Sequence, residues 1–265
     1  MAKHGPQNIK NVCIVGHGDS GKTTLADAMM FKAGATKRLG SVKDHTSIFD
    51  FDDMEREKLH SIDSAIARCE WQEDLIQVID TPGYPDYIAD AVGAISACEG
   101  AIVCVNAANG VQVTTRRVMR AAEKLGRARM IVVTKCDLPE LDIGTIVEDI
   151  RTWFGDVCIP ITWPAGTGDN FGEPTRLLLT KGGDTEEGQS YYQSFVESAV
   201  EVDDDVVARY LDGEEISGED LKRCFIKAVA DGNLVPIIFT SIEQGVGAGG
   251  VLDAIEDLFP SAGHA

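Results

Sequence analysis

Residues 16–24 read G-H-G-D-S-G-K-T-T, and the first eight of them match the pattern G-x-x-x-x-G-K-[ST]. Glycines in such a loop let several backbone N–H groups point at a phosphate, and a helix that starts near Lys22 adds the positive end of its dipole. The pattern places Lys22 on the β- and γ-phosphates and the Thr23 hydroxyl on Mg²⁺. A chance match is the alternative, but this stretch follows an apolar run and opens a helical one. The residues predicted to hold nucleotide phosphates are Gly16, His17, Gly18, Asp19, Ser20, Gly21, Lys22, Thr23 and Thr24.

A second group, Asp80-Thr81-Pro82-Gly83, follows the apolar run at residues 75–79. An acid at this point can hold Mg²⁺, mostly through water, since that ion keeps part of its hydration shell. Gly83 can bring its backbone N–H close to a γ-phosphate because no side chain stands in the way. Taken alone, the tetrapeptide is more simply an ordinary turn. Its position on the next clear strand after the phosphate loop favours a nucleotide site.

A third group, Thr134-Lys135-Cys136-Asp137, follows the apolar run at residues 130–133. A carboxylate at Asp137 can accept from the ring N–H and the exocyclic NH₂ of guanine together. Adenine offers no such donor pair, and sites built on hydrogen bonds can discriminate by about 10⁴-fold. Lys135 can lay its methylene stem along the base. A solvated loop is the alternative, but the order of the three groups favours a base site. Thr240, Ser241 and Ile242, after the last apolar run, are predicted to complete the base pocket with a backbone N–H.

The strands that must position these groups are predicted at residues 11–15, 75–79, 101–105 and 130–133, each a short apolar run. Helical patterns at residues 22–31, 87–97, 113–125 and 143–153 separate or follow them. This alternation predicts an α/β fold of the P-loop NTPase type, a mostly parallel sheet with helices on both faces and an inserted helical subdomain. Residues 38–63 are polar with weak periodicity, which is typical of a long functional loop.

The alternation breaks after residue 163. Residues 166–188 read as loops, and residues 190–230 predict two acidic amphipathic helices broken at Leu211-Asp212-Gly213. The strand and helix patterns return at residues 235–240 and 251–259. We therefore predict a GTP-binding core at 8–163, an inserted subdomain at 164–233, and the last strand and helix of the core at 234–260.

Composition excludes several classes of protein. The chain has 265 residues, is 44% hydrophobic and 25% charged, and carries a formal net charge of −19, which excludes disordered and coiled-coil proteins. It has no apolar run of about 18 residues for a membrane helix and a polar start unlike a secretory signal. The seven scattered cysteines contain no C-x-x-C pair, so neither a disulfide framework nor a zinc ribbon is expected. We expect a cytoplasmic protein that contacts no membrane. Because its basic residues are interspersed with acids, we expect no direct nucleic-acid binding.

Together these motifs resemble the G domain of elongation factor G, the bacterial translocation factor. The family's A-H-I-D-A-G-K-T-T is similar to residues 16–24, its D-T-P-G-H-V-D-F to residues 80–87, its N-K-x-D to T-K-C-D, and its S-A to Ser241-Ile242. The resemblance runs from about residue 8 to residue 260. Family members continue into further domains that contact the ribosome, so we expect this chain to be a fragment or excised domain. The resemblance implies a monomer whose full-length form acts with the ribosome.

Three departures from the family bear on activity. Residues 58–62 read K-L-H-S-I where the family has R-G-I-T-I, so the resemblance implies that Ser61 binds Mg²⁺ with Thr23 and Asp80. A solvent-facing loop residue is the alternative for Ser61. Thr134 replaces the family's Asn, which predicts a weaker tie between the base loop and the phosphate loop. Tyr84 replaces the His that orients the attacking water, and a phenol cannot carry an imidazolium charge near neutrality. The other histidines, His17 apart, are interpreted as surface residues.

The resemblance thus implies an enzyme that binds GTP or GDP with Mg²⁺ and hydrolyses GTP slowly, with Lys22, Gly83 and Tyr84 as the catalytic residues. Loops near residues 38–63 and 80–95 would order with GTP and relax with GDP. Two alternatives remain. One is a nucleotide-binding switch with little or no hydrolysis, which Tyr84 favours. The other is a P-loop ATPase or kinase, against which Asp137 argues.

Overall fold

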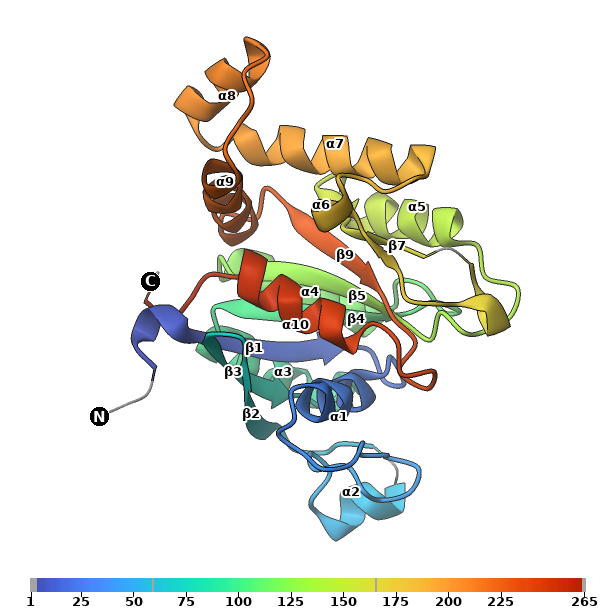
Figure 1. Cartoon of the computed structure of the whole chain (residues 1–265). Helices are drawn as coiled ribbons and strands as arrows, with labels where there is room; N and C mark the ends of the chain where they lie inside the picture. The colour runs from blue at the N-terminus through green and yellow to red at the C-terminus, as the bar shows by residue number, and fades with distance from the viewer. Residues whose placement is uncertain (1–3, 59, 165, 264–265) are drawn as a thin grey trace.

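A seven-stranded sheet forms the centre of the computed structural model, which describes residues 4–58, 60–164 and 166–263 (Figure 1). The strand order is β2-β3-β1-β4-β5-β9-β6. The strands are β1 (Ile9–Gly16), β2 (Ala65–Trp71), β3 (Asp74–Asp80), β4 (Gly100–Asn106), β5 (Ala128–Thr134), β6 (Cys158–Pro160) and β9 (Val235–Phe239). Every neighbouring pair is parallel except β2 and β3. This arrangement confirms the predicted α/β class.

Helices cover both faces of the sheet, as a parallel sheet requires. One face packs against α1 (Lys22–Lys32), α9 (Gly218–Ala230) and α10 (Ala248–Leu258), and the other against α3 (Ile88–Ala97), α4 (Val113–Lys124) and α5 (Ile143–Phe154). All residues of β4 and β5 are buried, because their apolar side chains meet a helix layer on either side. The helix layers hold these central strands in fixed register.

The parallel strands place the three motifs at one end of the sheet. Ile14 of β1 is paired with Asp80 of β3, and Asn106 of β4 with Thr134 of β5. The phosphate loop follows β1, and residues 240–242 follow β9, beside β5. Since ligands of open α/β sheets bind beyond the carboxyl ends of the strands, this end is where a site is expected.

Two strands of the sheet were not predicted. In β2 exposed positions such as Ile66 and Arg68 alternate with buried ones, because β2 is an edge strand. β6 has only three residues and lies at the opposite edge, outside β9. A short helix, α2 (Asp53–Lys58), also lies within the long loop at residues 38–63. Edge and very short elements lack the continuous apolar run on which the prediction relied.

Residues 186–230 contain three helices, not two. They are α7 (Glu186–Val200), α8 (Asp204–Leu211) and α9. The predicted pair is wrong because Asp203 caps a separate helix, its carboxylate accepting from Val206 N at 3.2 Å. Ser217 caps α9 in the same way, accepting from Asp220 N at 3.1 Å. In Figure 1, α8 extends away from the sheet, whereas α7 packs against α9 and the edge strand β6.

The segment between α5 and α7 is not all loop. It contains a two-stranded sheet of β7 (Thr162–Trp163) and β8 (Thr175–Arg176), followed by α6 (Leu177–Thr180). The predicted division into a core at 8–163 and 234–260 and an inserted subdomain at 164–233 stays a prediction. Among the described residues, no helix combines the length and apolar character needed to cross a bilayer.

Candidate functional site

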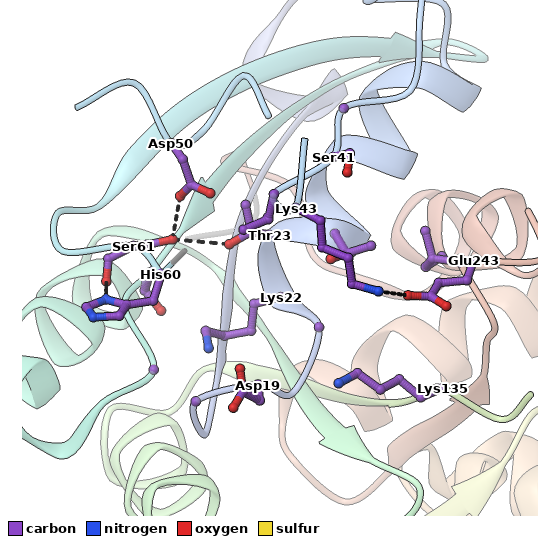
Figure 2. Close-up of a pocket in the computed structure, with 18 of the residues that line it drawn as sticks. Asp19, Lys22, Thr23, Ser41, Lys43, Asp50, His60, Ser61, Lys135 and Glu243 are labelled. Atoms are coloured by element: carbon purple, nitrogen blue, oxygen red, sulfur yellow. Dashed lines mark hydrogen bonds and ion pairs between the residues drawn. The ribbon is translucent and has the colours of Figure 1, made fainter. Parts of the chain in front are cut away.

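A cavity of about 420 Å³ opens where the three motifs meet (Figure 2). The predicted site residues that line it are Gly18, Asp19, Gly21, Lys22, Thr23, Thr24, Ser61, Thr81, Gly83, Tyr84, Lys135 and Ile242. The lining residues that the sequence did not single out as site residues are Leu39, Gly40, Ser41, Val42, Lys43, Asp50, His60 and Glu243. All but Glu243 of this second set belong to the loop at residues 38–63, which therefore forms one wall of the cavity.

The phosphate loop presents a buried cation. Lys22 Nζ donates to the main-chain oxygen of His17 at 2.9 Å. Burial lowers the pKa of Lys22, and the nearby Asp80 carboxylate opposes that shift. A Cβ at Gly83 would lie 2.7 Å from the main-chain oxygen of His17 and 2.8 Å from Gly18 N, so only glycine fits there without a backbone shift. A buried ammonium beside a bare main-chain segment suits an anionic ligand such as a phosphate.

The three predicted magnesium ligands lie together. Thr23 Oγ1 donates to Asp80 Oδ2 at 2.6 Å and lies 3.2 Å from Ser61 Oγ. Ser61 Oγ donates in turn to Asp50 Oδ1 at 2.8 Å, so Ser61 is not a plain solvent-facing residue. Among the described residues, Asp80 Oδ1 is buried with no hydrogen-bond partner. An oxygen-only donor set with one unsatisfied carboxylate oxygen fits Mg²⁺.

The charge state of Asp80 depends on what binds beside it. Burial raises the pKa of this carboxyl to about 7, while the hydrogen bond from Thr23 and the charge of Lys22 act in the opposite direction. A cation at Oδ1 would favour the ionised form. A cation bound beside Asp80 would therefore lower the pKa of this carboxyl and stabilise its ionised form.

Glu55 holds Ser61 in this position. Its buried side chain accepts from Ile62 N at 2.9 Å and Asp63 N at 3.1 Å through Oε1, and from Asp52 N at 3.1 Å through Oε2. These bonds join the start of α2 to the segment after Ser61. The sequence did not single out Glu55, because its structural role depends on contacts that the pattern does not encode.

The two predicted base loops are tied to each other. Asp137 Oδ1 accepts from Ser241 Oγ at 2.6 Å, and Cys136 N donates to Thr240 O at 3.1 Å. Lys135 lines the cavity with a left-handed backbone, φ 59°. Asp137 and Ser241 are not among the residues that line the cavity.

A tie between the base loop and the phosphate loop is present, and its weakening relative to an Asn at residue 134 stays a prediction. Thr134 Oγ1 donates to Ser20 O at 2.9 Å. The short side chain reaches because the loops are close: a Cβ built on Gly21 would lie 3.5 Å from Thr134 Oγ1. Asn106 at the end of β4 adds a longer contact from its Nδ2 to Asp19 O at 3.4 Å. Asn106 was not predicted from the sequence, although a polar amide directly after the apolar run at residues 101–105 could have indicated it.

The other predicted residues are not part of the cavity lining. Those outside its lining are Gly16, His17, Ser20, Asp80, Pro82, Thr134, Cys136, Asp137, Thr240 and Ser241. His17 Nδ1 lies 3.0 Å from Thr114 Oγ1. Burial raises the pKa of Cys136 to about 12, so its thiol stays protonated. Cys136 acts in the site through its backbone.

Tyr84 lies over the phosphate loop and beside a histidine. Its ring carbons Cε1 and Cζ are 3.5 Å from where a Cβ on Gly18 would sit. The ring centroids of Tyr84 and His60 are 4.7 Å apart. His60 lines the cavity, so the interpretation of the remaining histidines as surface residues is wrong for His60.

Comparison with known proteins agrees with this geometry. Residues 7–261 match the family described as "Elongation factor Tu GTP binding domain". The chain is 30% identical to an "Elongation factor G-like protein" of Thermotoga maritima, covering 96% of this chain and 38% of that one. It is also 30% identical to an "Elongation factor G 2" of Syntrophus aciditrophicus, covering 96% of this chain and 40% of that one.

A solved structure is similar over the same region. The crystal structure of ttk003000868 from Thermus thermophilus superposes with a TM-score of 0.89 at 33% identity, covering 97% of this chain and 41% of that one. The chain therefore spans about two fifths of the length of these relatives.

Proposed function

Because this chain belongs to the family of the elongation factor Tu GTP-binding domain, we propose that it binds GTP and GDP with Mg²⁺ and hydrolyses GTP slowly. We further propose that it is the G domain of an elongation factor G-like protein that works as a monomer with the ribosome in the cytoplasm. The observation that carries the proposal is the convergence of Lys22, Thr23, Ser61 and Tyr84 on one cavity, with Asp80 bonded to Thr23.

The chain's own residues divide the work of phosphoryl transfer. Lys22 and the backbone N–H groups of the phosphate loop hold the β- and γ-phosphates. Gly83 brings its backbone N–H to the γ-phosphate, and the wall that contains Tyr84 positions water for in-line attack. Thr23, Ser61 and Asp80 would hold Mg²⁺, which when bound neutralises charge on the phosphate oxygens.

Guanine selectivity rests on Asp137. Its Oδ1 already accepts from Ser241, and Oδ2 supplies a further acceptor for the paired donors of guanine. Lys135, in its left-handed conformation on the cavity wall, would lie along the base. Adenine would leave the carboxylate without a matching donor pair, which argues against an ATPase or kinase.

A competition titration tests the nucleotide. Fluorescent GDP bound to the protein with Mg²⁺ should be displaced by GTP at least about 10²-fold more effectively than by ATP. Lys22→Ala should abolish binding, whereas Lys37→Ala, an exposed lysine outside the cavity, should not. Equal displacement by ATP would contradict the assignment.

A switch that barely hydrolyses is the second candidate, which Tyr84 at the position of the family's His favours. Single-turnover hydrolysis, measured with and without ribosomes, separates the two. Slow turnover that ribosomes accelerate supports the GTPase, and bound GTP that stays intact in both conditions supports the switch.

A further inference from the structure

The ring of Tyr84 contacts residues of two loops. It lies against Gly18, where a Cβ would sit 3.5 Å from the ring carbons, so the absence of a side chain at residue 18 makes room for it. It also contacts His60, with ring centroids 4.7 Å apart and ring planes tilted by 56°. Tyr84 follows the Asp80–Gly83 motif, and His60 comes from the loop that precedes β2. The two rings therefore join two loops at the phosphate end of the cavity.

His60 is placed by the cluster that would hold the metal. It directly precedes Ser61, whose hydroxyl is bonded to Asp50 and lies within hydrogen-bond distance of Thr23. Figure 2 shows the imidazole of His60 beside Ser61 on the cavity wall. Its Nδ1 lies 3.3 Å from Ser61 O. If Nδ1 carries the proton and donates to that carbonyl, Nε2 remains as a hydrogen-bond acceptor.

We propose that His60 and Tyr84 together position the attacking water, with His60 as a positioning residue supplied by the opposite loop. This inference rests on the proposed GTPase function. The Tyr84 hydroxyl offers one hydrogen bond, and His60 Nε2 accepts a second from the same water. His17 is not a substitute, because its Nδ1 is already engaged with Thr114. The imidazole of His60 thus takes the role of the histidine that the family has at the position of Tyr84.

Hydrolysis of GTP by this water leaves the side chains of His60 and Tyr84 chemically unchanged. The water oxygen forms a bond to the γ-phosphorus, and the bond from that phosphorus to the bridging oxygen breaks. The electron pair of the broken bond leaves with GDP, and both protons of the water end on inorganic phosphate, which can release one of them to solvent. His60 and Tyr84 orient the water through hydrogen bonds and are unchanged at the end.

The test uses variants that separate packing from hydrogen bonding. His60→Phe keeps a ring against Tyr84 but has no nitrogen, and His60→Gln restores an acceptor. Single-turnover GTP hydrolysis should fall by about 10²-fold in His60→Phe, while GTP and GDP affinities stay within about twofold and His60→Gln recovers part of the rate. The same Phe substitution at His45, an exposed histidine of the same loop outside the cavity, should leave the rate unchanged.

A second measurement needs no turnover. With 3-fluorotyrosine incorporated, the ¹⁹F resonance of Tyr84, assigned with Tyr84→Phe, should shift in His60→Ala and not in His45→Ala. If His60→Phe hydrolysed GTP at the wild-type rate, or lost nucleotide affinity in parallel with its rate, the inference would be overturned and the proposed GTPase function would not. A protein that binds GTP but never hydrolyses it would overturn the proposed GTPase together with the inference. An unshifted Tyr84 resonance would show that the rings do not meet.

Discussion

At the scale of single residues, the site is built around two buried charges that water no longer stabilises. Burial lowers the pKa of Lys22 and raises that of Asp80 to about 7, since low-polarity surroundings disfavour the charged form of either group. A phosphate beside Lys22 and a cation beside Asp80 would each favour the charged form. Binding of the nucleotide and Mg²⁺ should therefore increase the stability of the folded protein.

Asp137→Asn is expected to change the base preference of the site from guanine to xanthine. The amide oxygen can still accept from Ser241, but the NH₂ group cannot accept from guanine and suits the 2-oxo group of xanthine. GTP affinity should fall by at least about tenfold and affinity for xanthosine triphosphate should rise. Equilibrium titrations of both nucleotides measure this, with Glu140→Gln, an exposed residue three positions on, as the control. Unchanged GTP affinity would refute the role of Asp137.

Asp27 should give the protein a pH-dependent stability. Its carboxylate accepts from Ile48 N at 3.1 Å through Oδ1, while Oδ2 is buried without a hydrogen-bond partner among the described residues. Burial raises the pKa of Asp27 above its usual 3.8. The folded state then binds this proton more tightly than the unfolded state, so the contribution of Asp27 to stability is fully present below its usual pKa of 3.8 and is lost as pH rises through the raised folded pKa.

Asp27→Asn removes the titratable carboxyl group but keeps a side-chain oxygen that can accept from Ile48 N. Relative to wild type, the variant's free energy of unfolding should therefore increase as pH rises from about 4 to 8. Urea denaturation at several pH values provides the measurement. Parallel stability curves for the two proteins would mean that the Asp27 carboxyl titrates alike in the folded and unfolded states.

At the scale of elements, we expect the loop at residues 38–63 to control access to the cavity. It supplies one wall, the Asp50–Ser61 cluster and the ring of His60. Across the cavity, Lys43 Nζ of this loop pairs with Glu243 Oε1, just after β9, at 2.7 Å, and Figure 2 shows the pair. Both side chains are largely exposed, so the pair is easily broken. This contact is suited to delaying nucleotide release without preventing it.

Breaking the pair should therefore speed nucleotide dissociation. Lys43→Glu and Glu243→Lys should each accelerate release of a fluorescent GDP by about 2- to 5-fold, as expected for an exposed ion pair. The double variant, which restores opposite charges, should return toward the wild-type rate, and high salt should reduce all differences. Stopped-flow release experiments check this. A double variant as fast as the single variants would exclude an ion-pair effect.

At the scale of the whole molecule, charge governs how this chain meets other macromolecules. The formal net charge is −19, and many basic side chains are already paired with acids, as Arg209 is with Glu214 and Asp220 and Lys222 is with Asp257. An acidic surface of this kind repels the phosphates of RNA and is screened by salt. The chain alone thus has little electrostatic attraction to a ribosome.

We expect this chain alone to co-sediment weakly with ribosomes in the presence of a non-hydrolysable GTP analogue. Binding should improve as salt rises from low to moderate concentration, because screening reduces like-charge repulsion. Pelleting assays across a salt series measure the bound fraction, with GDP as the matched condition. Tight binding that does not respond to salt would contradict this expectation.

Local chemistry in the sequence determined the phosphate loop, the Asp80 and Asp137 groups and the buried central strands. Each of these depends on residues within a few positions of one another or on one continuous apolar run. The edge strand β2, the three-residue β6 and the separate helix α8 were not predictable in this way. Their stability comes from neighbours distant in the chain or from a single capping side chain such as Asp203.

Only the tertiary structure decided how the rest of the site is assembled. Lys43 meets Glu243 across 200 positions, and Thr134 reaches Ser20 across 114. His60 lies in a loop with no periodicity, yet the chain path places its ring against Tyr84. Such contacts follow from where parallel strands end and how a loop folds back over them. Periodicity and motif spacing carry local information, whereas the meeting of distant side chains is set by the packing of the whole chain.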